Sequence, residues 1–157
     1  MGTIIEISNL TKTYNTHYAV KDISFSVKEG SLFAFLGTNG AGKSTTIEIL
    51  CTLLQKSSGQ VIINGFNLDQ NNEGNIRKSI GVVFQQSLLD SRMTVEENIL
   101  HRGKMYGLSA KELKDNYAFV TNYLQLEDIA HKFYGKLSGG QKRRADIARA
   151  LIHRPKI

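Results

Sequence analysis

Cysteine and proline are almost absent from this chain of 157 residues, which contains one of each. The single cysteine, Cys51, excludes an internal disulfide and favours a reducing, cytosolic environment. The sequence also lacks any apolar run of about 18 residues, and its first ten residues lack the basic and apolar pattern of a secretion signal. We therefore expect a chain that neither spans a membrane nor carries an export signal.

Internal repeats, low-complexity tracts and long linkers are absent, and the length is that of one domain. An acidic excess is absent too, since 20 Lys and Arg oppose 14 Asp and Glu, for a formal net charge of +6. The cations are scattered, and Lys142-Arg143-Arg144 is their one run. We interpret most of them as solvated surface. For the run itself, a solvated or interface face and a contact with nucleic acid are the alternatives.

The most informative stretch that is present runs from Gly37 to Thr45, GTNGAGKST, and fits the pattern G-x-x-x-x-G-K-S/T. Its glycines let main-chain amides approach anionic oxygens, and Lys43 adds a positive charge. Residues 31–36 before it form an apolar run typical of a strand buried on both faces of a parallel sheet. The residues after it predict a helix with one apolar face, made of Ile47, Leu50, Cys51 and Leu54. This order predicts a nucleotide-binding site, and the alternative is an ordinary glycine-rich turn.

The remaining N-terminal pattern is that of strands. Residues 4–10 and 18–27 alternate as expected for an antiparallel sheet, with a polar segment, residues 11–16, between them. Residues 60–63 predict a further strand that ends at the tight turn Asn64-Gly65. Residues 80–84 predict a second strand buried in a parallel sheet. The fold class expected from these elements is α/β.

Helices are expected from about residue 90 to residue 137. Capping boxes, in which a Ser or Thr is followed three residues later by Glu, place helix starts at Thr94 and Ser109. A third helix opens at Leu137-Ser138-Gly139-Gly140-Gln141, where Ser138 and Gln141 again fit the spacing of a capping box and adjacent glycines expose amides to an incoming anion. Taken alone, this last pattern indicates only a capped helix.

Together, the phosphate-loop pattern and the string LSGGQ resemble the ATP-binding cassette (ABC) family over the whole chain. The resemblance implies a P-loop NTPase fold of the ABC type, with an antiparallel β subdomain, a parallel-sheet core and a helical signature subdomain at about residues 90–137. It also implies ATP and Mg²⁺ as cofactors. Members of this family work as head-to-tail pairs, in which the signature of one copy meets the ATP held by the phosphate loop of the other.

The resemblance also implies roles for individual residues. Lys43 would contact the β- and γ-phosphates, Ser44 would supply a hydroxyl ligand to Mg²⁺, and Thr45 would support the α-phosphate side. Tyr14 falls where the family places an aromatic ring that stacks on adenine, and a locally packed strand-end tyrosine is the alternative. Gln85 matches the glutamine that reaches Mg²⁺ and the attacking water, although Gln86 leaves a one-residue ambiguity, so Lys43 and Gln85 are the expected catalytic residues. The expected nucleotide-binding set is completed by Gly37, Thr38 (where the family often has proline), Asn39, Gly40, Ala41 and Gly42, and by Ser138, Gly139, Gly140 and Gln141.

After the signature helix, the family continues into a buried strand ending in Asp-Glu, a further loop aspartate and a histidine near the γ-phosphate. These elements do not occur before Ile157. We therefore expect residues 1–157 to be the first two thirds or so of a longer ATPase domain. The isolated chain is expected to turn over ATP far more slowly than an intact domain and to self-associate.

The implied function is that of the ATPase subunit of a membrane transporter, cytoplasmic and peripheral at the inner face of the cell membrane. Its implied partners are a second ABC ATPase domain and a separate transmembrane permease subunit, and no nucleic acid partner is expected. Residues 87–98 and 105–108 resemble cassettes of drug exporters, including the daunorubicin type, so export is expected. The alternatives are a soluble cassette ATPase acting in translation or assembly, and a kinase or GTPase of another family with the same loop.

Overall fold

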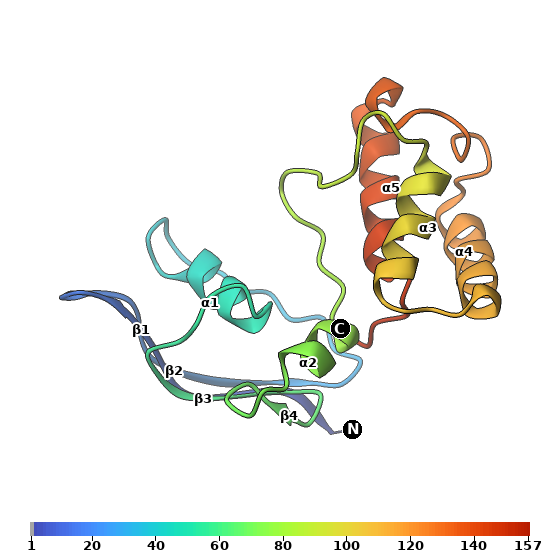
Figure 1. The fold of residues 1–157 in the computed structure, drawn as a ribbon. Helices are drawn as coiled ribbons and strands as arrows, with labels where there is room; N and C mark the ends of the chain where they lie inside the picture. The colour runs from blue at the N-terminus through green and yellow to red at the C-terminus, as the bar shows by residue number, and fades with distance from the viewer. Residues whose placement is uncertain (1) are drawn as a thin grey trace. The chain divides into compact units, whose positions relative to one another are not determined.

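The computed structural model describes residues 2–157, which divide into two compact units (Figure 1). The first unit ends at Ile80, and the second runs from Gly81 to Ile157. The first contains an antiparallel sheet with two short helices, and the second is helical. Among the residues described, no helix combines the length and the apolar character needed to cross a bilayer.

The sheet of the first unit has four strands: β1 (Thr3–Tyr14), β2 (His17–Lys28), β3 (Ser58–Ile63) and β4 (Phe66–Asn67), in the order β2-β1-β3-β4. All neighbours are antiparallel, as the sequence predicts. β1 and β2 continue through the polar segment that was expected to separate them, since Tyr14 still pairs with His17. The turn between β3 and β4 is made by Asn64 and Gly65, whose φ angles of 49° and 80° fit the predicted tight turn.

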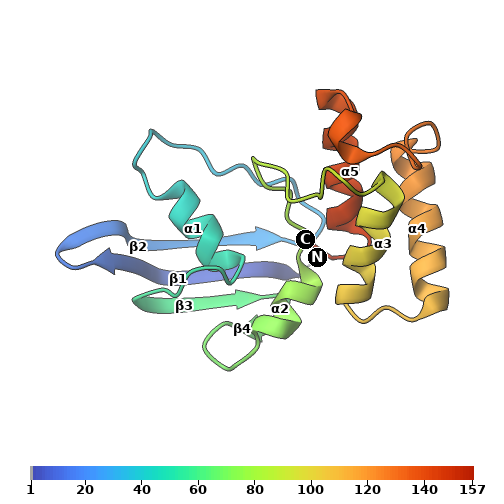
Figure 2. The ribbon, with the colours of Figure 1, turned by 45° about the horizontal axis from the view of Figure 1, so that its top comes forward.

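Two helices, α1 (Lys43–Leu50) and α2 (Glu73–Ser79), lie on the same face of this sheet (Figures 1 and 2). Apolar side chains from the sheet and both helices are fully buried and form the core of the unit: Leu10, Val61 and Ile63 from strands, Ile49 from α1 and Ile76 from α2. The start of α1 is thereby fixed against the strands. This packing positions the loop that precedes the helix.

The apolar face predicted for α1 is wrong in detail. Thr46 and Ile49 are its buried residues, whereas Ile47 is 46% exposed. The helix ends at Leu50, so Cys51 caps it and Leu54 lies beyond it. The physical reason is that the sheet covers the side of α1 that carries Thr46 and Ile49. No other sheet among residues 2–157 covers the side of Ile47.

The two strands predicted for a parallel core, residues 31–36 and 80–84, are irregular in the structure. Phe33 and Phe35 pack on Phe25 of β2, with ring centroids 5.2 and 5.5 Å from the Phe25 ring, so one side of the first segment is covered. On its other side Leu32 is fully exposed. A parallel strand needs hydrogen-bonded neighbours and helices over both faces. The described residues contain a single sheet, which is antiparallel, so these segments lack such neighbours.

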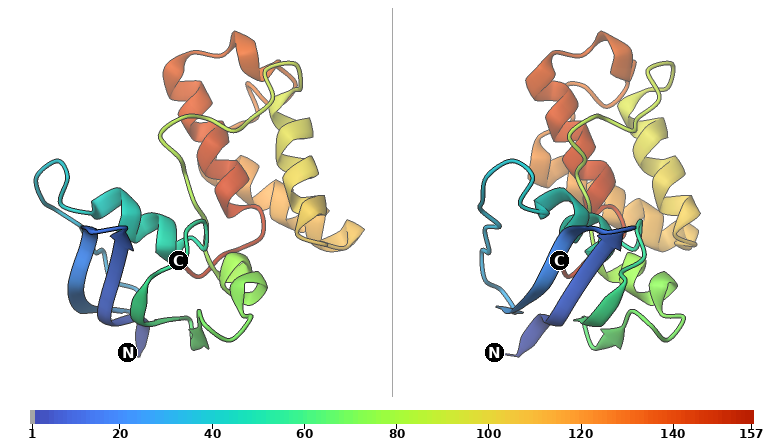
Figure 3. Two further views of the ribbon diagram at one scale, coloured as in Figure 1. Left: turned by 60° about the vertical axis from the view of Figure 1, so that its left-hand side comes forward. Right: turned by 90° about the vertical axis from the view of Figure 1, so that its left-hand side faces the viewer.

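The second unit contains α3 (Val95–Met105), α4 (Ala110–Leu124), the short 3₁₀ helix η1 (Tyr134–Lys136) and α5 (Gly139–Leu151). Figure 3 shows α5 (red) packed beside α3 (yellow) and α4 (orange). The helices bury one apolar cluster, whose fully buried members include Val95, Ile99, Val120, Ala145, Ala148 and Ile152.

All three predicted capping boxes are formed in the second unit. Thr94 caps α3, Ser109 caps α4 and Ser138 caps α5, each with the side chain three residues later bonded back to the cap. At the first cap, the main-chain amide and hydroxyl of Thr94 donate to the Glu97 carboxylate at 2.7 and 2.9 Å. These hydrogen bonds lower the pKa of Glu97. The helix starts are therefore set by side chains within one turn.

Candidate functional site

The loop before α1 lies against the beginning of β2. Gly40 and Gly42 have φ angles of 85° and 80°, in the left-handed region that glycine adopts without strain. A Cβ on Gly42 would overlap the carbonyl oxygen of Ala19 and lie 3.0 Å from a methyl carbon of Val20. Glycine is thus needed at position 42 for two reasons, its backbone conformation and the close approach of β2.

Lys43 closes this loop around its own side chain. Its ammonium donates to the carbonyl oxygens of Gly37 at 2.7 Å and Thr38 at 2.6 Å. The amide and the hydroxyl of Thr46 both donate to the Gly42 carbonyl at 2.9 Å, which begins the helical ladder. The amides of residues 43–45 precede that ladder and belong to the positive end of the helix. A cation and several main-chain donors therefore gather at one place.

A cavity of about 270 Å³ lies over these donors. It is lined by two residues of β2 and six of the loop and helix start: His17, Ala19, Asn39, Gly40, Gly42, Lys43, Ser44 and Thr45. The cavity therefore brings together six of the nine residues predicted between Gly37 and Thr45. Gly37 and Thr38 meet the Lys43 ammonium instead of the cavity, and the amide of Ala41 donates to the Thr38 carbonyl at 3.2 Å.

Sequence reasoning missed His17 and Ala19 as members of this cavity. Both precede the loop by some twenty residues, and only the strand pairing brings them to it. Ala19 lies at a register shift of this pairing, because Lys12 pairs with Val20 and Thr13 with Tyr18. Tyr14 is the direct cross-strand partner of His17 at the end of the hairpin. Tyr14 is 49% exposed, and the Lys12 ammonium lies 4.9 Å from the centroid of its ring.

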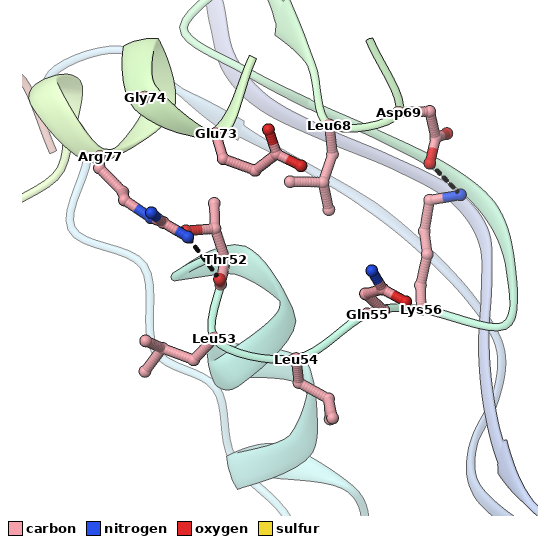
Figure 4. Close-up of a pocket in the computed structure, with 10 residues that line it drawn as sticks. All are labelled: Thr52, Leu53, Leu54, Gln55, Lys56, Leu68, Asp69, Glu73, Gly74 and Arg77. Carbon is pink, nitrogen blue, oxygen red and sulfur yellow. Dashed lines mark hydrogen bonds and ion pairs between the residues drawn. The ribbon is translucent and has the colours of Figure 1, made fainter. Parts of the chain in front are cut away.

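A second and larger cavity in the same unit, of about 720 Å³, contains none of the predicted site residues (Figure 4). Its walls are residues 52–56, Leu68 and Asp69, which follow β4, and Glu73, Gly74 and Arg77 of α2. Two carboxylates, Asp69 and Glu73, lie among its walls, and Asp69 pairs with the Lys56 ammonium at 2.9 Å. The lining of the smaller cavity contains Lys43 and no carboxylate. The smaller cavity is therefore the better anion site, despite its size.

The signature residues open α5 in the second unit. Ser138 is the N-cap, its amide donates to the Gln141 side-chain oxygen at 3.0 Å, and its hydroxyl accepts from the Gln141 amide at 3.4 Å. Gly139 and Gly140 are exposed, and a Cβ on either would meet no atom within 4 Å. Glycine near a helix start is less favourable than alanine. The packing of the chain itself therefore gives no reason for two glycines at this position.

Gln85 is exposed in the irregular segment that follows Gly81. Two contacts with α5 hold this segment on either side of Gln85: Arg143 donates to the Phe84 carbonyl at 3.0 Å, and the Ser87 hydroxyl donates to Asp146 at 2.5 Å. Tyr134 also contacts Asp146 at 3.4 Å, and burial raises the pKa of this phenol.

The basic run on α5 serves the second unit itself. Beside the contact of Arg143 with Phe84, Arg144 donates to the Gln125 carbonyl at 2.5 Å. Lys142 lies over the Tyr134 ring at 5.6 Å from its centroid. These cations thus hold loops of the unit against α5.

A glycine-bearing loop wrapped around a lysine at a helix start, with a capped LSGGQ helix in a helical unit, defines a class of phosphate-binding proteins. Residues 20–157 match the family described as "ABC transporter". The chain belongs to this family, and its fold is that of the cassette ATPases, as the sequence predicts.

Two curated relatives and two solved structures illustrate the match. The linearmycin resistance ATP-binding protein LnrL of Bacillus subtilis is 38% identical over 98% of this chain and 49% of its own length. The bacitracin transport ATP-binding protein BcrA of Bacillus licheniformis is 38% identical over 100% of this chain and 50% of its own. The chain thus spans about half the length of these relatives.

The structure of cbiO1 from Clostridium perfringens, part of the complex cbiONQ, superposes with a TM-score of 0.87 and 28% identity, covering 99% of this chain and 63% of that one. The dimeric cassette MJ0796 bound to ADP and Pi superposes with a TM-score of 0.80 and 32% identity, covering 96% and 70%.

Proposed function

We propose that the chain is the ATP-binding part of an ABC membrane transporter subunit, which in the complete protein binds and hydrolyses ATP to drive transport. The observation that carries the proposal is the cavity over the loop. Lys43, Ser44, Thr45 and the main chain of Gly40 and Gly42 line a single space large enough for a chain of phosphates. The family match supports ATP as the ligand, and the MJ0796 structure is a relative that holds ADP and Pi.

The roles proposed for the lining residues follow from their donors. The Lys43 ammonium receives the β- and γ-phosphates, the amides of residues 40–45 surround them, and Thr45 lies toward the α-phosphate. Tyr14 stacks on adenine, which the exposure of its ring permits. Gln85 positions the attacking water. Protein groups in phosphoryl transfer act chiefly by positioning and by stabilising charge.

The residues present are compatible with Mg²⁺. The described residues contain no cluster of three or more His, Cys, Asp or Glu side chains that could hold a metal. Mg²⁺ bound with a nucleotide needs few protein ligands, because it keeps waters and takes phosphate oxygens. Ser44 lines the cavity, and its hydroxyl is an oxygen ligand of the kind that Mg²⁺ prefers. We propose Ser44 and Gln85 as its protein ligands. When bound, Mg²⁺ neutralises charge on the phosphates.

A second copy of the cassette is the partner proposed for the signature end of α5. The packing of this chain does not require glycine at the two exposed positions, 139 and 140. A close approach of another molecule would explain why glycine stands there. Ser138, Gly139, Gly140 and Gln141 would then meet the γ-phosphate of ATP on that copy. Because they would do so only in the closed pair, ATP would favour pairing and hydrolysis would release it.

Gly139→Ala tests this pairing. Its added methyl group meets no atom of the chain within 4 Å, so thermal stability should not fall. Pairing in saturating MgATP, measured by sedimentation velocity on the full chain, should weaken. Unchanged pairing would count against the proposed role of the signature.

A separate transmembrane permease is the second proposed partner, which places the subunit in the cytoplasm at the inner face of the cell membrane. The cbiO1 structure supports this as a relative named as part of a transporter complex.

Export is the direction we propose, and the relative named for linearmycin resistance supports it. Cells that carry Lys43→Ala in the complete protein should become more sensitive to an exported compound, for which linearmycin and bacitracin are the first probes. Increased tolerance would argue for uptake.

Titration of the full chain with MgATP tests the central proposal. Lys43→Ala removes a charged hydrogen-bond donor, a group that contributes about 1.5–3 kcal/mol, so affinity should fall about 10- to 100-fold. Lys114→Ala is the matched control, since Lys114 is an exposed lysine of α4. Equal affinities for the two variants would contradict the assignment of the loop.

A further inference from the structure

We infer that His17 contacts the sugar of the bound nucleotide. Its imidazole hydrogen-bonds a ribose hydroxyl and helps to select a ribonucleotide. This inference rests on the proposed function and adds a specificity-determining residue to that site. The structure places His17 beside both ends of the site. It lines the same cavity as Lys43, and it is the cross-strand partner of Tyr14.

The first link is between His17 and the phosphate end. Ala19 precedes Val20 on β2, and its carbonyl oxygen touches Gly42 so closely that no Cβ fits there. His17 lies two residues earlier on the strand, and a register shift at Ala19 separates the two, since Lys12 pairs with Val20 and Thr13 with Tyr18. His17 and Ala19 both line the cavity. The strand that contacts Gly42 therefore also brings His17 to the cavity.

The second link is between His17 and the base end. Directly opposite residues of an antiparallel pair have side chains on the same face, with Cβ atoms about 4.5–5.5 Å apart. Tyr14 and His17 are such a pair, at the closed end of the β1–β2 hairpin. The ring of Tyr14 is half exposed and available to a base.

A nucleotide has a fixed order of base, sugar and phosphates. With the base on Tyr14 and the phosphates at Lys43, the residue adjoining both lies beside the sugar. An imidazole can donate from one ring nitrogen and accept at the other, so it suits a hydroxyl, which also does both. His17 is exposed and lines the cavity, so its imidazole is accessible to a ligand there.

The experiment measures the affinity of the full chain for four Mg²⁺-loaded ligands: ATP, 2′-deoxy-ATP, 3′-deoxy-ATP and inorganic tripolyphosphate. His17→Ala should weaken ATP binding about three- to tenfold, the range of one net hydrogen bond. It should leave tripolyphosphate binding unchanged. One of the two deoxy analogues should bind the unmodified chain as weakly as ATP binds His17→Ala. That analogue should bind the unmodified chain and His17→Ala with equal affinity. His17→Asn, which keeps a donor and an acceptor, should recover part of the loss.

His101→Ala is the matched control, because His101 is an exposed histidine on α3 in the other unit. It should bind all four ligands like the unmodified chain. Equal weakening of ATP and tripolyphosphate by His17→Ala would overturn the inference, since the imidazole would then contact phosphate. No weakening of either would overturn it too. If the unmodified chain bound neither ATP nor tripolyphosphate, the proposed function itself would fail, a result distinct from the failure of His17 alone.

Discussion

Replacing Gly42 by alanine should destabilise the first unit more than any other single methyl group added to the phosphate loop. Two costs combine at this position. The φ angle of 80° lies in the left-handed region, which costs a residue with a Cβ about 1–2 kcal/mol. The new methyl group would also overlap the Ala19 carbonyl and crowd Val20, and such overpacking costs about 1–3 kcal/mol. The sum, about 2–5 kcal/mol, is a large share of the 5–15 kcal/mol by which domains are stable.

Gly40→Ala separates the two costs. Its φ angle of 85° is nearly the same, yet a Cβ on Gly40 would meet no atom within 4 Å. This variant should lose only the backbone contribution, about 1–2 kcal/mol. Urea-induced unfolding of the full chain, followed by circular dichroism, measures both free energies of unfolding. Equal losses for the two variants would refute the reasoning, because they would show that β2 does not press on the loop at Gly42.

Three further predictions concern other parts of the chain. Hydrogen bonds from Thr94 lower the pKa of Glu97 below its ordinary value of 4.5. These bonds therefore stabilise the folded chain fully at a pH above the pKa of Glu97 in the unfolded state, and this stabilisation is lost as the pH falls through the pKa of Glu97 in the folded state. Glu97→Gln should reduce this acid sensitivity in thermal melts, and an unchanged pH dependence would contradict the assignment. Burial raises the pKa of the Cys51 thiol. Alkylation of Cys51 by iodoacetamide should therefore require a higher pH than alkylation of free cysteine. An apparent pKa equal to that of free cysteine would argue against burial of this thiol. Ile99→Ala should lower the free energy of unfolding by about 2–5 kcal/mol because Ile99 is fully buried, whereas Met105→Ala at an exposed site should change it by about 0.5 kcal/mol or less.

The features that the sequence predicts best are those decided by residues close together in the chain. The caps at Thr94, Ser109 and Ser138 each depend on a partner three residues later, and all three are formed. The turn at Asn64-Gly65 depends on two adjacent residues that tolerate positive φ. The contacts of Lys43 with carbonyl groups five and six residues away are also local, although the sequence analysis did not predict them.

Features that depend on distant partners could not be read in this way. The apolar run at residues 31–36 predicts a buried strand, but burial needs neighbouring strands that the run itself does not specify, and Leu32 is exposed. The buried side of α1 was misassigned for the same reason, because it depends on which sheet covers the helix. His17 joins the cavity through the register of β1 and β2, a long-range property that no local pattern around His17 indicates.

The two hydrogen bonds of Lys43 have a consequence for how the site fills and empties. An ammonium group carries three hydrogens, and the carbonyls of Gly37 and Thr38 take two of them. The third is left for an incoming oxygen, which can be received while the other two stay in place. The entropy of arranging the loop is then lost once, during folding, and not again at each arrival of a ligand. A single side chain thus both closes the loop and offers a hydrogen to the ligand.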